Sequence, residues 1–344
     1  MRVREEMVGN GLPGLEEIER AAKLVYESMP ATPQYSWPQI NRRAGAEVWV
    51  KHENHTPVGA FKVRGGLVYM DWLRRSRPEV ETVVSATRGN HGQSIAYAAT
   101  RSGYRAVIVV PHGNSVEKNA AMRGLGAELI EFGGDFQAAN EHGAALAIEN
   151  GWHRIPSFDL RLVLGVATYA LEFFRGAPEM ERVYVPIGMG TGVCGMIAAR
   201  DALGLRTAIV GVVSSGAPAM ARSFEVGEVV EVEARTRIAN GVACRLPDAM
   251  ALGFVREGVE RVVEVDDDEV EEAMRLYFRA THNAAEGAGA IGLAALLKEG
   301  SRSTRSGTAS SGTAGAGGPG RVGTVLCGGN VDSDVFGRVL LGGG

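Results

Sequence analysis

The sequence predicts an α/β protein with two doubly wound domains whose sheets are mostly parallel. Apolar segments of four to seven residues, each typical of a buried strand, alternate with segments of helical periodicity along most of the chain. Glycine-rich loops follow three of these strands. Because ligands of such sheets bind at the carboxyl ends of the strands, we expect these loops to form the functional site.

The elements are predicted in the following order. A strand over 46–53 is followed, after a glycine turn, by a helix over 61–76. Next come strand 81–87, helix 89–103, strand 105–111, helix 116–126, strand 127–133, helix 135–151, strand 153–157, a helix ending at 176, strand 182–188, helix 193–204 and strand 207–213. A small-residue helix over 287–300 precedes a last strand over 322–327, and the Gly/Ser/Thr/Ala-rich segment 301–321 between them predicts a flexible insertion.

The composition excludes several classes of protein. The 344 residues are 45% hydrophobic and 22% charged with a net charge of −4, unlike a basic nucleic-acid binder. The apolar runs are too short to span a membrane, and the N-terminal segment lacks the apolar core of a secretory signal. Three widely spaced cysteines favour a reducing compartment, hence the cytoplasm, and no CxxC or HxxxH spacing indicates a metal site.

The loop GMGTG, Gly188–Gly192, has the character of an anion-binding turn. It lies between a strand and a helix start, where backbone N–H groups converge and the helix field favours negative charge. No Lys-Ser/Thr pair of a Walker loop follows, and no acidic residue ends the next strand as a dinucleotide site would require. A phosphate cup and a plain glycine turn are both compatible with this spacing.

Two other loops and one lysine are ambiguous when each is taken alone. Asn90 and His91 in GNHG stand at a helix start, where a polar cap is common, and Cys327 in CGGN could be an ordinary buried cysteine. Lys62 in GAFKVRGG lies between two apolar residues at a strand-to-helix junction. Burial in an apolar pocket would lower the pKa of its amine and make it a nucleophile; the alternative is a lysine extended to solvent.

Together and in this order, GAFKVRGG, TRGNHGQ, GMGTG and CGGN resemble the motifs of the fold type II pyridoxal-phosphate enzymes, the tryptophan-synthase β-like fold. Within that group the chain is similar to the threonine/serine dehydratase and serine racemase branch. The resemblance covers about 32–339 and includes RIANGV and EGAGAIG. It implies a larger domain that binds pyridoxal 5′-phosphate, formed by 1–80 and 156–344, and a smaller domain, 81–155, that closes on the substrate.

The resemblance also implies roles for individual residues. Lys62 matches the lysine that forms a Schiff base with the cofactor aldehyde, and Phe61 matches the aromatic residue beside it. Thr87, Arg88, Gly89, Asn90 and His91 match the loop that binds the substrate carboxylate. Asn90 also matches the residue that binds the ring 3-hydroxyl. The phosphate cup is matched by Gly188, Met189, Gly190, Thr191 and Gly192. Cys327 matches the Ser or Cys facing the pyridine nitrogen, and Glu286 matches a glutamate near that end of the site.

The activity implied by the resemblance is deamination of a β-hydroxy amino acid to a 2-keto acid and ammonia. Freed Lys62 would remove the Cα proton before the β-hydroxyl leaves. Threonine or serine is the first expectation, with 3-hydroxyaspartate and 3-aryl serines as alternatives. We expect a homodimer without nucleic-acid or membrane partners. A further alternative is an amino-acid racemase. Another is a β-replacement enzyme of the cysteine-synthase type, but that branch has a different substrate loop. The last is a regulator that binds the cofactor without catalysis; such a protein would have lost the lysine or the phosphate cup, and both are present here.

Arg88 is the most informative departure from the family pattern. Many relatives have a small residue at this position. In serine racemases the residue is a serine, which acts as the acid/base on the second face of the substrate. A guanidinium stays protonated, so Arg88 disfavours racemisation. We expect it to pair with a substrate carboxylate, either the α-carboxylate or one on the side chain, which would point to 3-hydroxyaspartate. The alternative is that Arg88 points outward and only positions the loop.

Three further departures concern the cup, metal and regulation. Met189 and Thr191 replace glycines, and Met189 is tolerated only if its φ is ordinary. The segment after strand 207–213 lacks the carboxylates with which relatives bind a divalent cation, and Asn240 stands where relatives have an aspartate, so no metal is expected. A C-terminal regulatory domain is likewise not expected.

Overall fold

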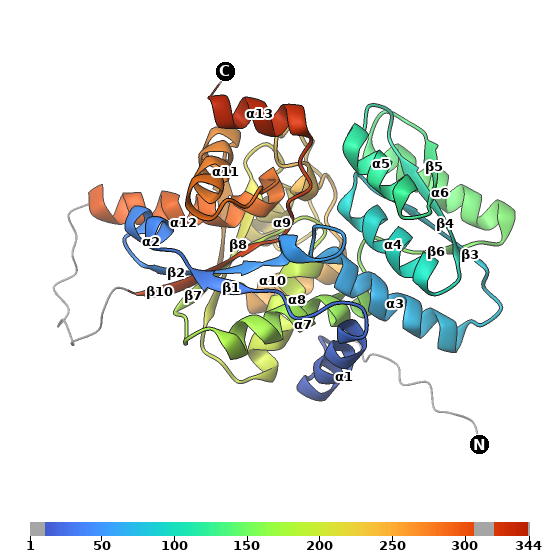
Figure 1. Ribbon diagram of the computed structural model, residues 1–344, viewed down its shortest axis with the longest axis horizontal. Helices are drawn as coiled ribbons and strands as arrows, with labels where there is room; N and C mark the ends of the chain where they lie inside the picture. The colour runs from blue at the N-terminus through green and yellow to red at the C-terminus, as the bar shows by residue number, and fades with distance from the viewer. Residues whose placement is uncertain (1–10, 306–319, 343–344) are drawn as a thin grey trace.

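The computed structural model describes residues 11–305 and 320–342, which contain two sheets (Figure 1). The larger sheet has the strand order β1 (Gln34–Ser36), β2 (Glu47–His52), β10 (Arg321–Leu326), β7 (Arg182–Pro186), β8 (Ala208–Ser214) and β9 (Arg261–Val265). The smaller has the order β5 (Glu128–Glu131), β4 (Arg105–Val110), β3 (Thr82–Ala86) and β6 (His153–Arg154). All strand pairs are parallel except β1 with β2, which confirms the predicted mostly parallel α/β fold.

Helices alternate with the strands and cover both sheets. They are α1 (Leu15–Tyr26), α2 (Pro38–Ala44), α3 (Lys62–Ser76), α4 (Asn90–Arg101), α5 (Val116–Gly124), α6 (Phe136–Asn150), α7 (Leu160–Gly176), α8 (Thr191–Ala202), α9 (Ala219–Val226), α10 (Ala249–Gly258), α11 (Asp267–Thr281), α12 (Gly287–Arg305) and α13 (Ser333–Leu341), with two 3₁₀ turns, η1 (Glu53–His55) and η2 (Asn240–Val242). In the described part of the chain, no helix combines the length and apolar character needed to cross a membrane.

The strand order brings distant loops to one edge of the larger sheet. β10, near the end of the chain, lies between β2 and β7, with Leu326 opposite His52 and Thr324 opposite Tyr184. Because these strands are parallel, the segments that follow each of them emerge side by side. The Lys62, GMGTG and CGGN segments therefore meet at this edge.

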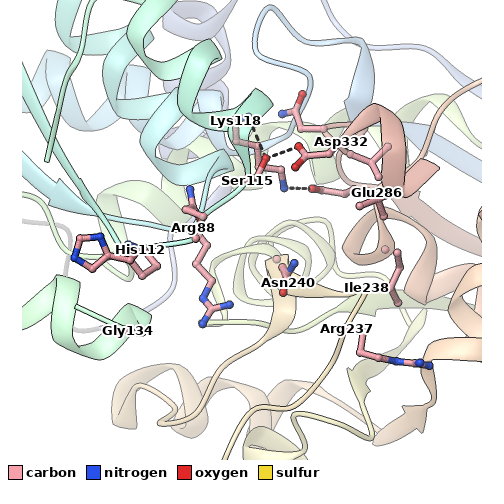
Figure 2. Close-up of a pocket in the computed structure, with 18 residues that line it drawn as sticks. Arg88, His112, Ser115, Lys118, Gly134, Arg237, Ile238, Asn240, Glu286 and Asp332 are labelled. Atoms are coloured by element: carbon pink, nitrogen blue, oxygen red, sulfur yellow. Dashed lines mark hydrogen bonds and ion pairs between the residues drawn. The ribbon is translucent and has the colours of Figure 1, made fainter. Parts of the chain in front are cut away.

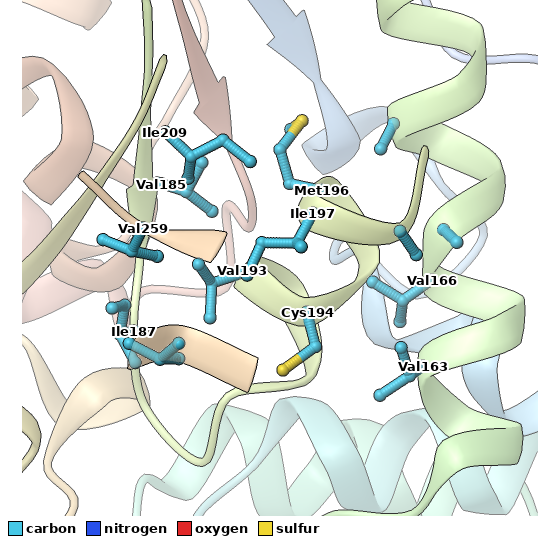
Figure 3. Close-up of a cluster of buried hydrophobic side chains, with 14 of the residues drawn as sticks. Val163, Val166, Val185, Ile187, Val193, Cys194, Met196, Ile197, Ile209 and Val259 are labelled. Atoms are coloured by element: carbon cyan, nitrogen blue, oxygen red, sulfur yellow. The ribbon is translucent and has the colours of Figure 1, made fainter. Parts of the chain in front are cut away.

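Apolar packing fixes where α8 begins. Val193 and Ile197 on α8 lie in one buried cluster with Val185 and Ile209 of the sheet and with Val166 of α7 (Figure 3). A layer of helices thus covers this face, while α11 and α12 bury their apolar sides against the opposite face. Because α8 is packed against the sheet on one side and against α7 on the other, its orientation is fixed, and its N-terminus points to the carboxyl edge of the sheet.

Helix α3 is held by a close crossing with α7 and by buried charges. A Cβ on Gly65 would lie 2.8 Å from the carbonyl oxygen of Leu162, so only glycine permits this approach. The buried Arg64 guanidinium bonds Glu53 through Nε at 2.8 Å and Glu172 through Nη1 at 2.6 Å. These contacts fix the first turn of α3, in which Lys62 is the first residue.

The predicted boundaries differ from the structure at a few places. Glu53, predicted as a strand residue, begins the 3₁₀ turn η1 because its side chain turns inward to Arg64. Helix α12 continues to Arg305 and β10 begins at Arg321, so both ends of the predicted insertion belong to regular elements. Residues 306–319, the rest of that prediction, lie outside the described residues.

Candidate active site

Lys62 has the environment of a reactive amine. Its Nζ donates a hydrogen bond to Thr191 Oγ1 at 2.9 Å and lies 5.2 Å from the centre of the Phe61 ring. Loss of water around the charged form lowers the pKa of this amine to about 8, and the nearby Cys327 opposes the shift. A substantial fraction of Lys62 is therefore neutral near physiological pH, as a nucleophile or proton acceptor requires.

The GMGTG loop exposes the N-terminus of α8 to the Lys62 side of the sheet. Gly190 is the N-cap residue and has a left-handed φ of 103°, with no side chain that caps the helix. Five other helices are capped by Ser115, Asp135, Asp159, Asp248 and Asp266. Since the first N–H groups of a helix have no acceptor within it, α8 presents free donors to an anion.

The loop is also shaped so that it excludes added side chains at Gly188 and Gly190. A Cβ on Gly188 would lie 2.9 Å from the Gly241 carbonyl oxygen, and one on Gly190 would lie 2.7 Å from the Ala251 Cβ. Met189 and Thr191 do not have positive φ, which confirms that ordinary side chains are tolerated there. The loop therefore forms a narrow backbone cup with the Thr191 hydroxyl at its rim.

The TRGNHG loop forms a second helix start at which the N-cap residue, Gly89, has no side chain. Thr87 organises it, because Thr87 Oγ1 accepts hydrogen bonds from Gly89 N at 2.9 Å and from Gly92 N at 3.2 Å. The N–H of Thr87 itself donates to the Val109 carbonyl. Helix α4 begins at Asn90 after Gly89, which has no side chain to cap it. Because Thr87 already accepts from Gly92 N, the N–H groups of Asn90 and His91 are the donors that remain for a ligand.

His91 is buried and neutral. Its burial, with a smaller contribution from the charge of Lys62, lowers the pKa to about 3, while a hydrogen bond with the Pro156 backbone opposes the shift. The Nε2 atom has no hydrogen-bond partner. His91 thus brings an uncharged ring with one free polar atom, rather than a cation, to the loop.

Asn90, Glu286 and Lys118 form a chain of polar contacts, of which Figure 2 shows the contact between Lys118 and Glu286. Asn90 Nδ2 donates to Glu286 Oε1, and Glu286 Oε2 pairs with Lys118 Nζ at 2.6 Å. Asn90 Oδ1 accepts a hydrogen bond from Asn330 Nδ2 at 3.0 Å. The Asn90 side chain is thereby oriented by partners from two distant segments.

Cys327 lies at the turn after β10, directly beside the start of α3. Its carbonyl oxygen accepts a hydrogen bond from Phe61 N at 3.0 Å, and its Sγ donates to the Ala288 carbonyl at 3.3 Å. Burial, followed by the charge of Glu286, raises the pKa of this thiol well above its ordinary value. Cys327 therefore remains a neutral thiol, which is a weak hydrogen-bond partner.

A cavity of about 310 Å³ adjoins this group of residues. Glu286, Gly241 and Asn330 line it, and so does Arg88, which is two residues before Asn90. The remaining lining residues are Pro111, His112, Gly113, Asn114, Ser115, Lys118, Gly134, Arg237, Ile238, Asn240, Gly287, Val331, Asp332 and Val335. Arg88 thus faces the cavity, contrary to the alternative in which it points outward.

The structure brings the predicted residues of all four loops together and adds others. A ligand that carries a phosphate and an aldehyde close together on a heteroaromatic ring suits the α8 cup and the adjacent Lys62 amine, with Asn90 and Cys327 as polar partners for the ring. Sequence reasoning missed Lys118 and gave no role of its own to Asn330, the last residue of the CGGN motif. Lys118 lies on α5 outside any motif, so only its ion pair with Glu286, just before α12, identifies it.

Comparisons with known proteins agree with this geometry. The profile of the family described as pyridoxal-phosphate dependent enzyme matches residues 27–312. The L-threonine ammonia-lyase of Thermotoga maritima is 29% identical over 332 residues, 95% of this chain and 78% of that protein. The biosynthetic L-threonine dehydratase of Haemophilus influenzae is 30% identical over 285 residues, 83% of this chain. The chain spans only about half, 55%, of that second relative's length.

The fold is similar to that of a solved threonine deaminase. The processed form of isoform 2 from Solanum lycopersicum superposes with a TM-score of 0.84 at 25% sequence identity. The superposition covers 100% of this chain and 99% of that chain. The two molecules therefore share the whole architecture described above.

Proposed function

Because the chain belongs to the pyridoxal-phosphate-dependent enzyme family, we propose that it is an ammonia-lyase that acts on a β-hydroxy amino acid. L-threonine and L-serine are the first substrates to consider, since the similar proteins are named L-threonine ammonia-lyase and L-threonine dehydratase. The observation that carries the proposal is the amine of Lys62, with a pKa of about 8, hydrogen-bonded at the uncapped start of α8.

Each of the loops has a task in this proposal. The backbone of 188–192 and the Thr191 hydroxyl bind the cofactor phosphate, Asn90 binds the ring oxygen, and the Cys327 thiol faces the ring nitrogen without protonating it. Lys62 holds the cofactor through its aldehyde. When bound, the cofactor supplies an electron sink that makes the substrate Cα–H acidic.

The remaining chemistry belongs to the side chains and to water. The N–H groups at the start of α4 bind the substrate α-carboxylate. Once the substrate amine has displaced Lys62 from the cofactor aldehyde, the released, neutral Lys62 amine takes the Cα proton. The β-hydroxyl leaves as water, and the resulting enamine consumes one water as it hydrolyses. Threonine thus gives 2-oxobutanoate and ammonia without net change in water.

The same loop favours elimination over racemisation. A racemase needs a proton donor and acceptor on the second face of the substrate, and Arg88 occupies the corresponding position. Its guanidinium stays protonated at neutral pH and does not accept the proton. We therefore place the lyase before the racemase.

Three finer features belong to the same proposal. The four strands of the smaller sheet all lie within the 81–155 segment, which supports a smaller domain that closes on the substrate and excludes water. The three cysteines are buried free thiols, which supports a reducing, cytoplasmic location. A homodimer is the expected assembly, and light scattering coupled to gel filtration measures it.

The experiment combines absorbance with product analysis. The purified protein is expected to show a band near the visible edge that is absent from Lys62→Ala, and to release 2-keto acid from L-threonine or L-serine. A protein that stays colourless after addition of pyridoxal phosphate contradicts the cofactor assignment. A coloured protein that forms only D-amino acids contradicts the lyase assignment.

A further inference from the structure

We propose that Arg88 binds a second carboxylate of the substrate, so that the preferred substrate is a β-hydroxy amino acid with a carboxylate on its side chain. The simplest such molecule is 3-hydroxyaspartate. This inference rests on the proposed ammonia-lyase function and assigns a substrate class to it.

Arg88 has no ion-pair partner among the described residues, whereas the lysine and the other arginine that line the cavity each have one. Its Nε is buried with no hydrogen-bond partner, and no ion pair joins it to another described residue. By contrast, Lys118 pairs with Glu286 at 2.6 Å, and Arg237 pairs with Asp267 at 3.3 Å. An unpaired buried guanidinium atom is costly unless a ligand supplies the acceptor.

The acidic residues of the cavity do not serve as that acceptor. Asp332 accepts a hydrogen bond from Ser115, and both oxygens of Glu286 are engaged by Asn90 and Lys118. Figure 2 shows the Arg88 guanidinium on the side of the cavity where Asn240 lies, away from Glu286 and Asp332. A carboxylate that enters this side meets an uncompensated positive charge.

The position of Arg88 in the chain links this charge to the substrate. It precedes by two residues the start of α4, where the free N–H groups are the donors proposed for the α-carboxylate. A substrate held there and carrying a second carboxylate places both anions on one loop. The fork of guanidinium N–H donors matches a carboxylate in bidentate fashion, whereas the methyl group of threonine leaves the guanidinium without an acceptor.

The first experiment compares kcat/KM for 3-hydroxyaspartate with kcat/KM for L-threonine. In the wild type we expect the ratio to favour 3-hydroxyaspartate, and in Arg88→Ala we expect it to fall about 10- to 100-fold, the factor of one lost charge-assisted interaction. Arg88→Lys, which keeps the charge but not the fork, should lie between them. Arg237→Ala, which removes an arginine that lines the same cavity but has its own carboxylate, should leave the ratio unchanged.

An equal loss on both substrates in Arg88→Ala would overturn the proposal, because it would place Arg88 on the α-carboxylate. A wild-type preference for threonine would overturn it as well. Retention of the cofactor absorbance band in each variant shows that it has folded, and the comparison of ratios is made on such variants.

The second experiment needs no turnover. Calorimetric titration of the holoprotein with succinate, which has two carboxylates, and with propionate, which has one, measures the second anion site directly. We expect succinate to bind at least about 10-fold more tightly, and Arg88→Ala to abolish the difference. Equal binding of both acids to the wild type would overturn the inference.

The two experiments separate this inference from the proposed function. If the coloured protein binds succinate through Arg88 but releases no keto acid from any β-hydroxy amino acid, the second-carboxylate site is supported and the proposed lyase function is contradicted. A protein that deaminates threonine but shows no Arg88-dependent binding of succinate retains the function and loses the site.

Discussion

The Lys62 amine donates a hydrogen bond to the Thr191 hydroxyl at 2.9 Å, although 129 positions separate the two residues in the chain. Both are the first residues of helices, α3 and α8, that start at the same edge of the larger sheet. The contact places the candidate nucleophile at the rim of the candidate phosphate cup. A ligand that bridges the two must therefore carry its reactive group close to its anion.

Attachment of pyridoxal phosphate to the cofactor-free protein is expected to depend on the protonation of Lys62. Its amine has a pKa lowered to about 8, and only the neutral form attacks an aldehyde. The rate should therefore rise about tenfold per pH unit below pH 8 and level off above it. Stopped-flow absorbance at several pH values measures this rate.

Lys62→Ala serves as the control for that measurement and should show no absorbance change from attachment of pyridoxal phosphate. A midpoint near 10.5, the ordinary value for lysine, would contradict the effect of burial on Lys62.

Two glycines of the cup allow a matched test of phosphate binding. Gly190→Ala forces a side chain into a left-handed conformation and against Ala251, at a cost of about 1–3 kcal/mol. Gly192→Ala adds a Cβ that would lie 3.6 Å from the Phe61 ring, an ordinary contact. Fluorescence titration with pyridoxal phosphate should show at least about 5-fold weaker binding for the first variant only. Equal weakening would mean that backbone shape at Gly190 has no special part in the site.

The alternating strands and helices of the two sheets could be predicted because each strand is a compact apolar run bounded by glycine or polar residues. The two edge strands of the larger sheet were not predicted: β1 has three residues and pairs antiparallel, and β9 is only half-buried over most of its length. Local sequence also carries no record of strand order. That β10 lies between β2 and β7, and so brings Cys327 beside Phe61, is a property of the assembled sheet.

In the candidate site, too, the residues within motifs could be predicted from the sequence, and contacts between distant segments could not. Lys62, Asn90 and the GMGTG loop carry motifs, so the sequence indicated them, and the structure brings them together. Lys118 has no motif and was missed, because its role depends on an ion pair with a residue 168 positions away. The inward direction of Arg88 was an open alternative at the sequence level, because a charged residue beside a glycine has no preferred direction.

The buried charges around Arg64 should dominate the stability of the Lys62 region. Arg64→Met removes one of the two buried cations of this cluster: Glu172 keeps its ion pair with Lys51, but Glu53 is left as a buried carboxylate without an ion-pair partner. We expect the free energy of unfolding to fall by about 3–5 kcal/mol, the cost of an uncompensated buried charge. Urea unfolding followed by tryptophan fluorescence measures it.

Arg75→Met is the matched control, because Arg75 lies on the same helix and pairs with Asp71 while its own side chain is 71% exposed. Its loss should stay below about 1 kcal/mol, as is usual for surface pairs. Similar losses in the two variants would contradict a special role for the buried cluster.

The Lys118–Glu286 ion pair should hold α5 against the start of α12. Both side chains are nearly buried and their atoms lie 2.6 Å apart, so this contact counts for more than a surface pair. Lys118→Gln leaves Glu286 with Asn90 alone and removes the charge that ties the helices of the smaller sheet to those of the larger. We expect amide hydrogen exchange to become faster in α5 and in the first turn of α13, where Glu117 Oε1 accepts a hydrogen bond from Ser333 N.

Arg123→Gln removes the other salt bridge of α5, an exposed pair with Glu131 that stays within the smaller sheet's own layer. It should leave exchange at α13 unchanged, because it does not reach the larger sheet. If Lys118→Gln also leaves α13 unchanged, the two halves are held by apolar packing and not by the ion pair. If both variants quicken exchange at α13, the effect comes from loosening of α5 itself. Only faster exchange at α13 in Lys118→Gln, without faster exchange there in Arg123→Gln, assigns the contact between the sheets to Lys118.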